Sequence, residues 1–351
     1  TDLDYVGTNS LNLPAPNPGT PVYRDTNEAG EVAINGNYAY VADWSIGLAI
    51  IDISDPTNPG TPVYKDTNGF AQGVTISGNY AYVADGASGL AIIDISDPIN
   101  PGIPIYEDTK GSAQSVTISG SYAYVADGGS SGLAIIDISD PTNPGTPVYR
   151  DTNGNAIGVT ISGNYAYVGS GLAGMAIIDI SDPTNPGTPT YEVINGDVYE
   201  ITTKGNQAYL AITSGLPAHN SGLTIIDISD PTNPGTPVYT DSALNRAAYD
   251  VAIRGNYAFL AYSSSGLAII DISDPTSPGS PVYRDTNGNA TGVAISGNYA
   301  YVADSQEGLA IIPINATDLT DAAGNRATLT LPSPGAAGSL GANKDLLIGN
   351  I

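Results

Sequence analysis

A ten-residue phrase that returns seven times constrains this chain more than any other feature of its sequence. The phrase reads Gly-Leu-Ala-Ile-Ile-Asp-Ile-Ser-Asp-Pro where it begins at Gly47, and variants of it begin at six later glycines. The steps between successive copies are 42, 43, 42, 48, 44 and 42 residues. Two further phrases, Gly-Asn-Tyr-Ala-Tyr-Val-Ala-Asp and Pro-Val-Tyr, also occur seven times with variations. A period of this length is typical of repeat architectures, so we expect seven copies of one structural unit.

Each unit divides into four strand-like runs. In the second unit these runs are Gly73–Ser77, Asn79–Ala84, Leu90–Ser96 and Ile103–Glu107. They are short and rich in Val, Ile, Tyr and Thr, and turn-forming residues separate each run from the next. The third run is apolar at successive positions, which indicates a strand that is covered on both faces. We therefore predict an all-β chain that forms a seven-bladed β-propeller with four-stranded antiparallel blades.

The two ends of the repeat region predict how the ring closes. The chain begins with a lone fourth-strand run that ends at Tyr23, and the last repeat ends after the third-strand run at residues 309–312. We expect the N-terminal strand to complete the last blade, which leaves no open edge. The propeller is thus predicted over residues 1–314. Residues 315–351 break the repeat and are expected to form a C-terminal extension or linker, leading to another surface module or self-associating by strand donation.

Composition excludes several classes of protein. The formal net charge of -25 disfavours binding to nucleic acid or to anionic lipid surfaces. The absence of cysteine excludes disulfides, thiolate catalysis and cysteine-ligated zinc. No apolar run approaches the length that spans a bilayer, so we expect no membrane insertion. Because the chain starts at Thr1 without a signal-peptide pattern, we expect a mature or excised portion of a longer protein.

The pentapeptide within the recurring phrase carries a family resemblance. It reads Leu90-Ala91-Ile92-Ile93-Asp94 in the second unit and recurs in register in other units, while the last copy has Pro313 in place of the aspartate. In this respect the chain resembles the LVIVD-repeat family of β-propellers over roughly residues 14–314. The resemblance implies a bacterial or archaeal secreted or cell-surface module, often part of a long multidomain protein. It brings no shared catalytic motif.

Two sets of carboxylates are candidate cation sites. The turn after the third strand places Asp52, Asp55 and Asn58 close together, as calcium ligands would be, although the same residues also favour a tight turn through their own backbone. The multiplicity of this turn favours the structural interpretation. On the opposite face, aspartates that follow the second strands are expected to surround one mouth of the central channel and to bind calcium, or else to form a solvated acidic surface. These metal candidates are Asp43, Asp85, Asp127 and Asp304.

Departures from the repeat on the same face predict a ligand-binding patch. Loops change without disturbing the core, so an irregular loop marks either a binding site or simple drift. Aromatic rings beside carboxylates and amides suit a sugar or a peptide. The candidate ligand-binding residues are Trp44, Tyr199, Glu200, His219, Arg246, Tyr249 and Asp250. Glu200 and Asp250 would also form the carboxylate pair of a glycoside hydrolase, although the sequence gives no sign of a raised pKa for either.

These observations rank three functions. The leading hypothesis is a non-catalytic scaffold, secreted or on the surface of a bacterial or archaeal envelope, whose partners are other surface proteins or glycans. The alternative is a lectin-like module that recognises carbohydrate or peptide, with calcium as a candidate cofactor. A glycoside hydrolase is the third and least supported hypothesis.

Overall fold

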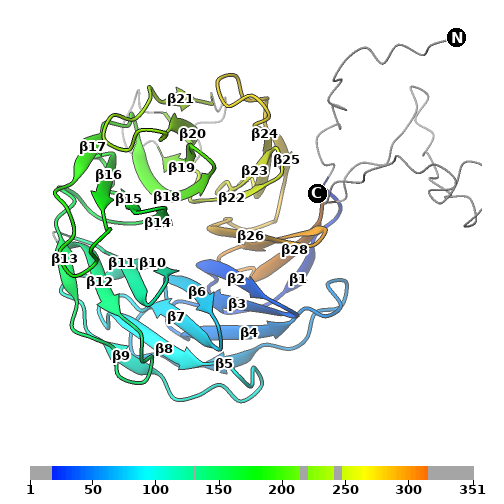
Figure 1. Cartoon of the computed structure of the whole chain (residues 1–351). Coiled ribbons are helices and arrows are strands. Elements are labelled where there is room, and N and C mark those ends of the chain that lie inside the picture. Colours follow the sequence, from blue (N-terminus) through cyan, green and yellow to red (C-terminus); the bar gives the residue numbers. More distant parts are fainter. Residues whose placement is uncertain (1–17, 130, 214–219, 241–246, 315–351) are drawn as a thin grey trace, which may run out of the picture.

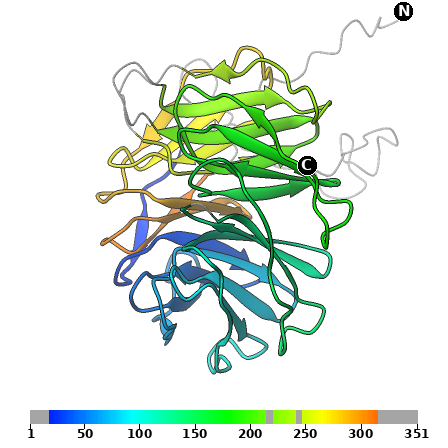
Figure 2. The same ribbon diagram turned by 90° about the vertical axis from the view of Figure 1, so that its left-hand side faces the viewer.

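The computed structural model of the chain describes residues 18–129, 131–213, 220–240 and 247–314, and within them it contains strands and no helix. The strands form seven four-stranded antiparallel sheets arranged as blades around a central channel (Figure 1). In the view turned by 90°, the strands of successive blades lie side by side (Figure 2). The prediction of a seven-bladed β-propeller is confirmed.

Each blade has its four strands in the same order from the channel outward. The innermost strands line the channel and are β2 (Glu31–Asn35), β6 (Gly73–Ser77), β10 (Ala113–Ser119), β14 (Val159–Ser162), β18 (Asp197–Lys204), β22 (Asp250–Arg254) and β26 (Gly292–Ser296). The second strands are β3 (Tyr38–Ala42), β7 (Tyr80–Ala84), β11 (Tyr122–Asp127), β15 (Tyr165–Gly169), β19 (Gln207–Thr213), β23 (Tyr257–Ala261) and β27 (Tyr299–Ala303).

The outer half of each blade is built from the recurring pentapeptide and from the Pro-Val-Tyr phrase. The third strands are β4 (Leu48–Asp52), β8 (Leu90–Asp94), β12 (Gly132–Asp137), β16 (Met175–Asp179), β20 (Gly222–Asp227), β24 (Leu267–Asp271) and β28 (Leu309–Pro313). The outermost strands are β1 (Val22–Arg24), β5 (Val63–Lys65), β9 (Ile105–Glu107), β13 (Val148–Arg150), β17 (Thr190–Glu192), β21 (Val238–Tyr239) and β25 (Val282–Arg284).

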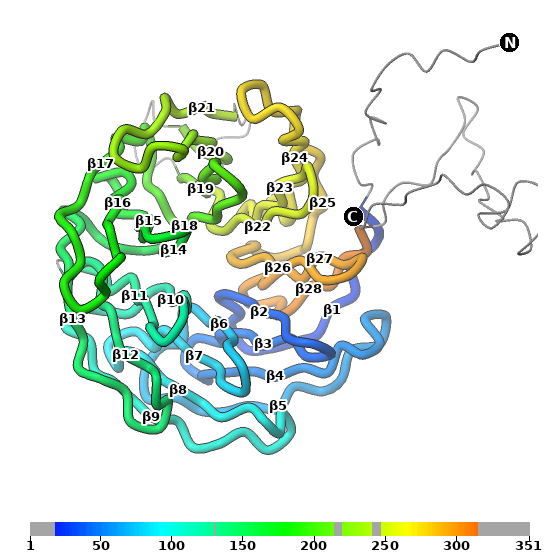
Figure 3. Tube along the Cα trace, in the orientation of Figure 1, coloured from blue at the N-terminus to red at the C-terminus, as the bar shows by residue number. Residues whose placement is uncertain are grey.

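The ring closes through the N-terminal strand, as the order of the phrases predicts. β1 pairs antiparallel with β28, with Val22 opposite Ile311 and Tyr23 opposite Ala310. The seventh blade therefore has the order β1-β28-β27-β26, and the chain trace returns to its start (Figure 3). The strand β1 thus covers the edge of β28 that would otherwise be unpaired between the first and last repeats.

The core lies between the blades. The buried apolar residues of the described chain form seven clusters, and each cluster joins two neighbouring blades. Alternation along the second strand explains how one blade serves two clusters: Val83 packs toward the first blade and Tyr82 toward the third. Burying each large apolar side chain contributes roughly 1.5–3 kcal/mol, so the blade interfaces hold the ring together.

The turn after the third strand is stabilised by its own backbone. Asp52 Oδ1 accepts a hydrogen bond of 2.8 Å from the Ser54 N–H, and Asp55 Oδ1 accepts from the Thr57 N–H at 3.0 Å and the Thr57 hydroxyl at 2.6 Å. Hydrogen bonds to the charged form lower the pKa of both carboxyls. These contacts are the ones that the turn interpretation of Asp52, Asp55 and Asn58 predicts.

Candidate functional site

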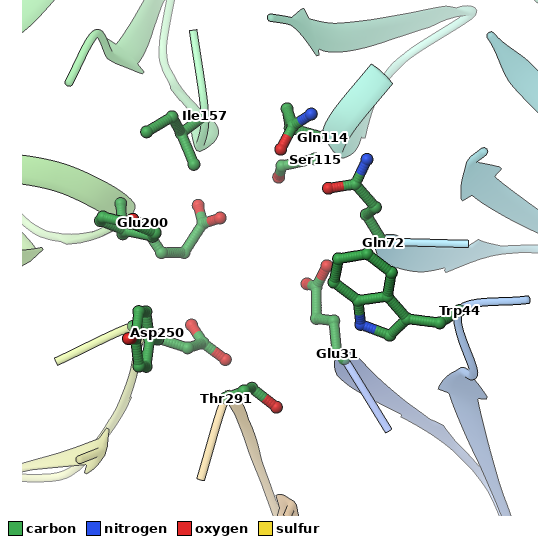
Figure 4. A pocket seen from close by; sticks show the side chains of 12 residues that line it. Glu31, Trp44, Gln72, Gln114, Ser115, Ile157, Glu200, Asp250 and Thr291 are labelled. Carbon is green, nitrogen blue, oxygen red and sulfur yellow. The ribbon is translucent and has the colours of Figure 1, made fainter. Parts of the chain in front are cut away.

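A cavity of about 220 Å³ opens at one mouth of the central channel (Figure 4). Most of its wall is built from residues at or just before the start of the innermost strands, and every blade contributes at least one of them. The lining residues are Gly30, Glu31, Trp44, Gln72, Gln114, Ser115, Ile157, Tyr199, Glu200, Tyr249, Asp250 and Thr291. The repeat therefore supplies a ring of equivalent positions, and the identity of the residue at each position decides the chemistry.

One ring of seven equivalent positions contains all three carboxylates of the cavity. Each position pairs with a small residue of the second strand, as Glu31 does with Ala42 and Asp250 with Ala261. Around the ring the occupants are Glu31, Gly73, Ser115, Gly158, Glu200, Asp250 and Gly292. Three acids thus share the ring with three glycines and a serine, and the carboxylates point toward the middle of the channel (Figure 4).

Two of the acids reach across to the next blade. Glu31 Oε2 accepts a hydrogen bond of 3.1 Å from the Val74 N–H, and Asp250 Oδ2 accepts one of 2.7 Å from the Val293 N–H. For Glu31, glycine at the neighbouring ring position leaves room for this contact. A Cβ atom at Gly73 would lie 2.7 Å from Glu31 Oε2, a distance that real Cβ atoms essentially never show.

Glu200 reaches in the opposite direction, toward the preceding blades. It accepts hydrogen bonds from the Ile201 N–H at 3.0 Å, from the Val159 N–H and from the Ser115 hydroxyl. A Cβ atom at Gly158 would lie 2.9 Å from Glu200 Cδ, so glycine is again the residue that makes room. Hydrogen bonds thus hold each of the three carboxylates, and glycine at the neighbouring ring position makes room for two of them.

Burial and mutual repulsion make these carboxylates hard to ionise. Burial raises the pKa of Glu31 well above its ordinary value, and the charges of Glu200 and Asp250 raise it further. Burial and the charge of Asp250 likewise raise the pKa of Glu200. Burial raises the pKa of Asp250 to about 6, although its two backbone hydrogen bonds oppose the shift. The mouth of the channel therefore favours a proton or another positive charge.

Raised pKa values predict that the protein is more stable at pH 5 than at pH 8. Between the ordinary carboxyl pKa and the raised one, the folded chain holds more protons than the unfolded chain, so stability falls as pH rises through that window. For Asp250 alone the whole shift corresponds to about 2–3 kcal/mol, of which about half is lost between pH 5 and pH 8. Below pH 4 the exposed turn aspartates with lowered pKa, such as Asp52, lose their stabilising charge. We expect maximum stability near pH 5.

Urea unfolding across pH 4–8 checks this prediction. Glu31→Gln and Asp250→Asn keep an acceptor oxygen but remove the titration, so each should shrink the difference between pH 5 and pH 8. Asp140→Asn is the matched control, because the hydrogen bonds from Thr142 lower the pKa of this exposed aspartate and it is ionised throughout that range. A stability profile that is flat or rises from pH 5 to pH 8 would contradict the buried-carboxylate interpretation.

The four metal candidates occupy separate places in the structure. Asp85 is fully buried and accepts hydrogen bonds from the Thr67 hydroxyl at 2.6 Å and from the Gly69 N–H at 2.8 Å. These donors belong to the loop that enters the same blade from the preceding one. The same arrangement recurs at Asp127 and Asp304, while Asp43 accepts from two backbone N–H groups of its loop.

These hydrogen bonds tie each aspartate to the loop that joins its blade to the preceding one. A ring of these four around the mouth was expected, whereas the described residues that line the cavity do not include Asp43, Asp85, Asp127 or Asp304. Within the described residues no group of three or more His, Asp or Glu side chains is placed to hold a metal ion. Each aspartate instead clamps the loop between two successive blades.

Trp44 stands out among the residues around the mouth. The equivalent turn position holds glycine or serine in other described blades, for example Gly86 and Ser263, and it has a positive φ there as well. Trp44 adopts this left-handed conformation with a φ of 40°, which costs a bulky residue roughly 1–2 kcal/mol. Trp44 is 37% exposed, and its ring lies beside that of Phe70, a residue that is 55% exposed, with ring centroids 6.1 Å apart. Of these two exposed aromatic residues, Trp44 lines the cavity.

The predicted ligand-binding residues largely come together. The cavity is lined by five of them, Trp44, Tyr199, Glu200, Tyr249 and Asp250. The rings of the two tyrosines pack edge to face, with their centroids 5.1 Å apart. The other two candidates, His219 and Arg246, lie outside the described residues.

Sequence reasoning missed several lining residues, including Glu31, Gln72 and Gln114. An alignment of the seven innermost strands would have revealed Glu31, because an acid stands there at a position that is glycine in the second unit.

The fold and the site together define a β-propeller with a cavity at one mouth of its channel, lined by carboxyl, amide and aromatic side chains. The chain belongs to the LVIVD repeat family, whose model matches it seven times, at residues 27–63, 68–105, 110–148, 153–188, 195–237, 245–281 and 287–320. No curated protein matches the chain. Among the described residues, no helix has the length and apolar character needed to cross a membrane.

Solved structures of low sequence identity share the fold. The β-propeller domain of Cps50 (Swd1) from Myceliophteria thermophila has a TM-score of 0.65 at 11% identity, with 86% of this chain and 100% of that one covered. The computationally designed Ika8 protein has a TM-score of 0.56 at 11% identity, covering 84% and 98%. BamB from Moraxella catarrhalis has a TM-score of 0.53 at 17% identity, covering 81% and 82%. At these identities the likeness concerns the fold alone.

Proposed function

We propose that this protein is a non-catalytic interaction scaffold that acts outside the cell or on its surface. The proposal rests on one observation: most of the repeat builds the fold, and the positions that depart from the repeat line the candidate site. The recurring phrases build the blade interfaces, and the turn and clamp aspartates are engaged by backbone groups. The departures from the repeat gather at one mouth of the channel. Such a rigid ring with one variable face suits the presentation of a binding surface to other surface proteins or to glycans.

A second candidate function, a ligand-binding module, is favoured by the cavity itself. Trp44, Tyr199 and Tyr249 offer aromatic surface, and Gln72 and Gln114 add amide groups around it. Concave sites with a few convergent polar groups are the usual places for small ligands. Carbohydrate or peptide groups are the ligands that suit this face.

The scaffold proposal also includes self-association through residues 315–351.

Binding to immobilised glycans and peptides separates these functions. A ligand-binding module predicts saturable binding of a small glycan or peptide inside the cavity, which Trp44→Gly weakens at least 10-fold. A scaffold that contacts larger partners across the face predicts no saturable binding of such small ligands inside the cavity. Glycine suits the backbone at this position, as Gly86 and Gly171 show, so the variant should fold. The non-catalytic proposal would be contradicted if the protein hydrolysed members of a glycoside panel and Glu200→Gln or Asp250→Asn abolished that activity.

A further inference from the structure

We propose that the cavity at the channel mouth binds an organic ammonium group, held between the aromatic side chains of the rim and the three carboxylates of the ring. The inference rests on the ligand-binding role proposed above and specifies its chemistry. It applies to the ammonium group of a small free amine and equally to that of a lysine side chain.

The charge of the wall selects a cation. Among the described residues, those that line the cavity include Glu31, Glu200 and Asp250 but no lysine, arginine or histidine. The rest of the chain reinforces this sign, since its formal net charge is -25. A carboxylate or phosphate ligand would meet three acids without a counter-charge, whereas a cation would relieve the repulsion between them.

The aromatic side chains favour an organic cation over a simple metal ion. Trp44 extends from the first blade to the rim of the cavity (Figure 4), and Tyr199 and Tyr249 line it from the fifth and sixth blades. Aromatic faces attract ammonium groups through their negative quadrupole, and quaternary ammonium ligands are the best-known examples. A metal ion would instead need several converging oxygen ligands, and the described residues contain no group of acids placed in that way.

The size and rigidity of the cavity fit a small head group. Its volume of about 220 Å³ is below the roughly 300–1,000 Å³ of pockets for drug-sized ligands, so an oligosaccharide would not fit inside it. The carboxylates are held in place by the N–H groups of Val74, Val159 and Val293. A ligand would therefore meet preorganised carboxyl oxygens and lose little affinity to side-chain ordering.

Calorimetric titration with choline tests the proposal against a neutral molecule of the same shape, 3,3-dimethylbutan-1-ol. At about 0.15 M salt, surface charges more than ~8 Å away are largely screened, so a general attraction to the acidic chain is suppressed. We expect saturable 1:1 binding of choline and at least 10-fold weaker binding of the alcohol. A second pair, Nα-acetyl-lysine amide and Nα-acetyl-norleucine amide, shows whether the cavity prefers a free amine or a lysine side chain.

Matched variants locate the binding. Trp44→Gly and Glu31→Gln should each weaken choline binding about 10-fold or more, and circular dichroism shows whether they are folded. Asp140→Asn removes one negative charge from a turn at the other end of the strands, outside the lining of the cavity, and should leave the affinity unchanged. Equal weakening by Asp140→Asn and Glu31→Gln would mean diffuse attraction and would overturn the proposal.

Two further outcomes separate this inference from the proposed function. If a neutral sugar binds with dependence on Trp44 while choline and the lysine amide do not, the cavity recognises a ligand but the ammonium assignment is wrong. If neither cationic probe binds and the glycan and peptide arrays also show no binding, both the ammonium assignment and the ligand-binding role are wrong. Equal affinity for choline and its neutral isostere would also overturn the assignment.

Discussion

Removal of residues 1–24 is expected to destabilise the protein more than the loss of any one buried aspartate. The truncation deletes β1, which supplies the fourth strand of the seventh blade and pairs with β28 over three residues. Tyr23 then no longer packs on the cluster between the sixth and seventh blades, and the Arg24 guanidinium no longer donates to the carbonyl of Pro59. Lost burial and lost hydrogen bonds together predict a decrease of at least ~4 kcal/mol in the free energy of unfolding.

Urea unfolding and size-exclusion chromatography measure this effect. Exposure of β28 as an edge strand also predicts concentration-dependent association, because its unpaired backbone groups can pair with another chain. Truncation of residues 1–17 is the matched control, since it keeps β1 and every contact of residues 18–24. Equal stability of the two truncated chains would show that β1 does not close the ring.

Asp85→Ala is expected to lower the free energy of unfolding by about 3 kcal/mol. The substitution leaves the Thr67 hydroxyl and the Gly69 N–H without their acceptor in a buried place, and each unsatisfied donor costs roughly 1–3 kcal/mol. Asp85→Asn keeps one acceptor oxygen and should recover about half of the loss. Burial raises the pKa of the carboxyl, so the charge itself contributes less than the hydrogen bonds.

Thermal and urea denaturation of the two variants check this prediction. Asp97→Ala is the control, because Asp97 belongs to the same blade but accepts its hydrogen bonds in an exposed turn, where a loss within about 1 kcal/mol is expected. If Asp85→Ala were no more destabilising than Asp97→Ala, the loop-clamp role of the buried aspartates would be refuted.

The architecture was predictable because every level of the sequence agrees. The seven copies of each phrase predict the number of blades. The third strand, apolar on both faces, predicts that the blades pack against one another, and the order of the phrases at the two ends predicts how the ring closes. Individual turns were also predictable, since Asp52 and Asp55 bond to residues two positions away. Local chemistry of this kind can be read from the sequence.

The candidate site was predictable in part. Glu200 and Asp250 are visible as departures from a small residue at one position of the repeat, and Tyr199 and Tyr249 are the residues directly before them. Glu31 is the same departure in the first blade, where Glu-Val-Ala-Ile replaces the Gly-Val-Thr-Ile that begins at Gly73, and an alignment of the innermost strands would have revealed it. The aromatic contact of Trp44 with Phe70 depends on how two loops meet, which no repeat pattern specifies.

The role of the buried aspartates was not predictable from their position alone. The sequence places Asp43, Asp85, Asp127 and Asp304 after the second strand, where an exposed carboxylate and a buried one look alike. Their burial depends on a loop from the preceding blade that folds over the carboxylate and donates to it. A ring of charges at the mouth was therefore expected, whereas the structure shows separate clamps.

The most direct test of the closed ring is a cross-link between β1 and β28. The chain has no cysteine, so the double variant Val22→Cys with Ile311→Cys would contain the only two thiols. These residues are direct partners in the antiparallel pair, at a separation that suits a disulfide. Oxidation of the folded protein should form this bond within one chain, whereas the out-of-register pair Val22→Cys with Leu309→Cys should form it far less. Equal cross-linking of both pairs, or of neither, would contradict the closure.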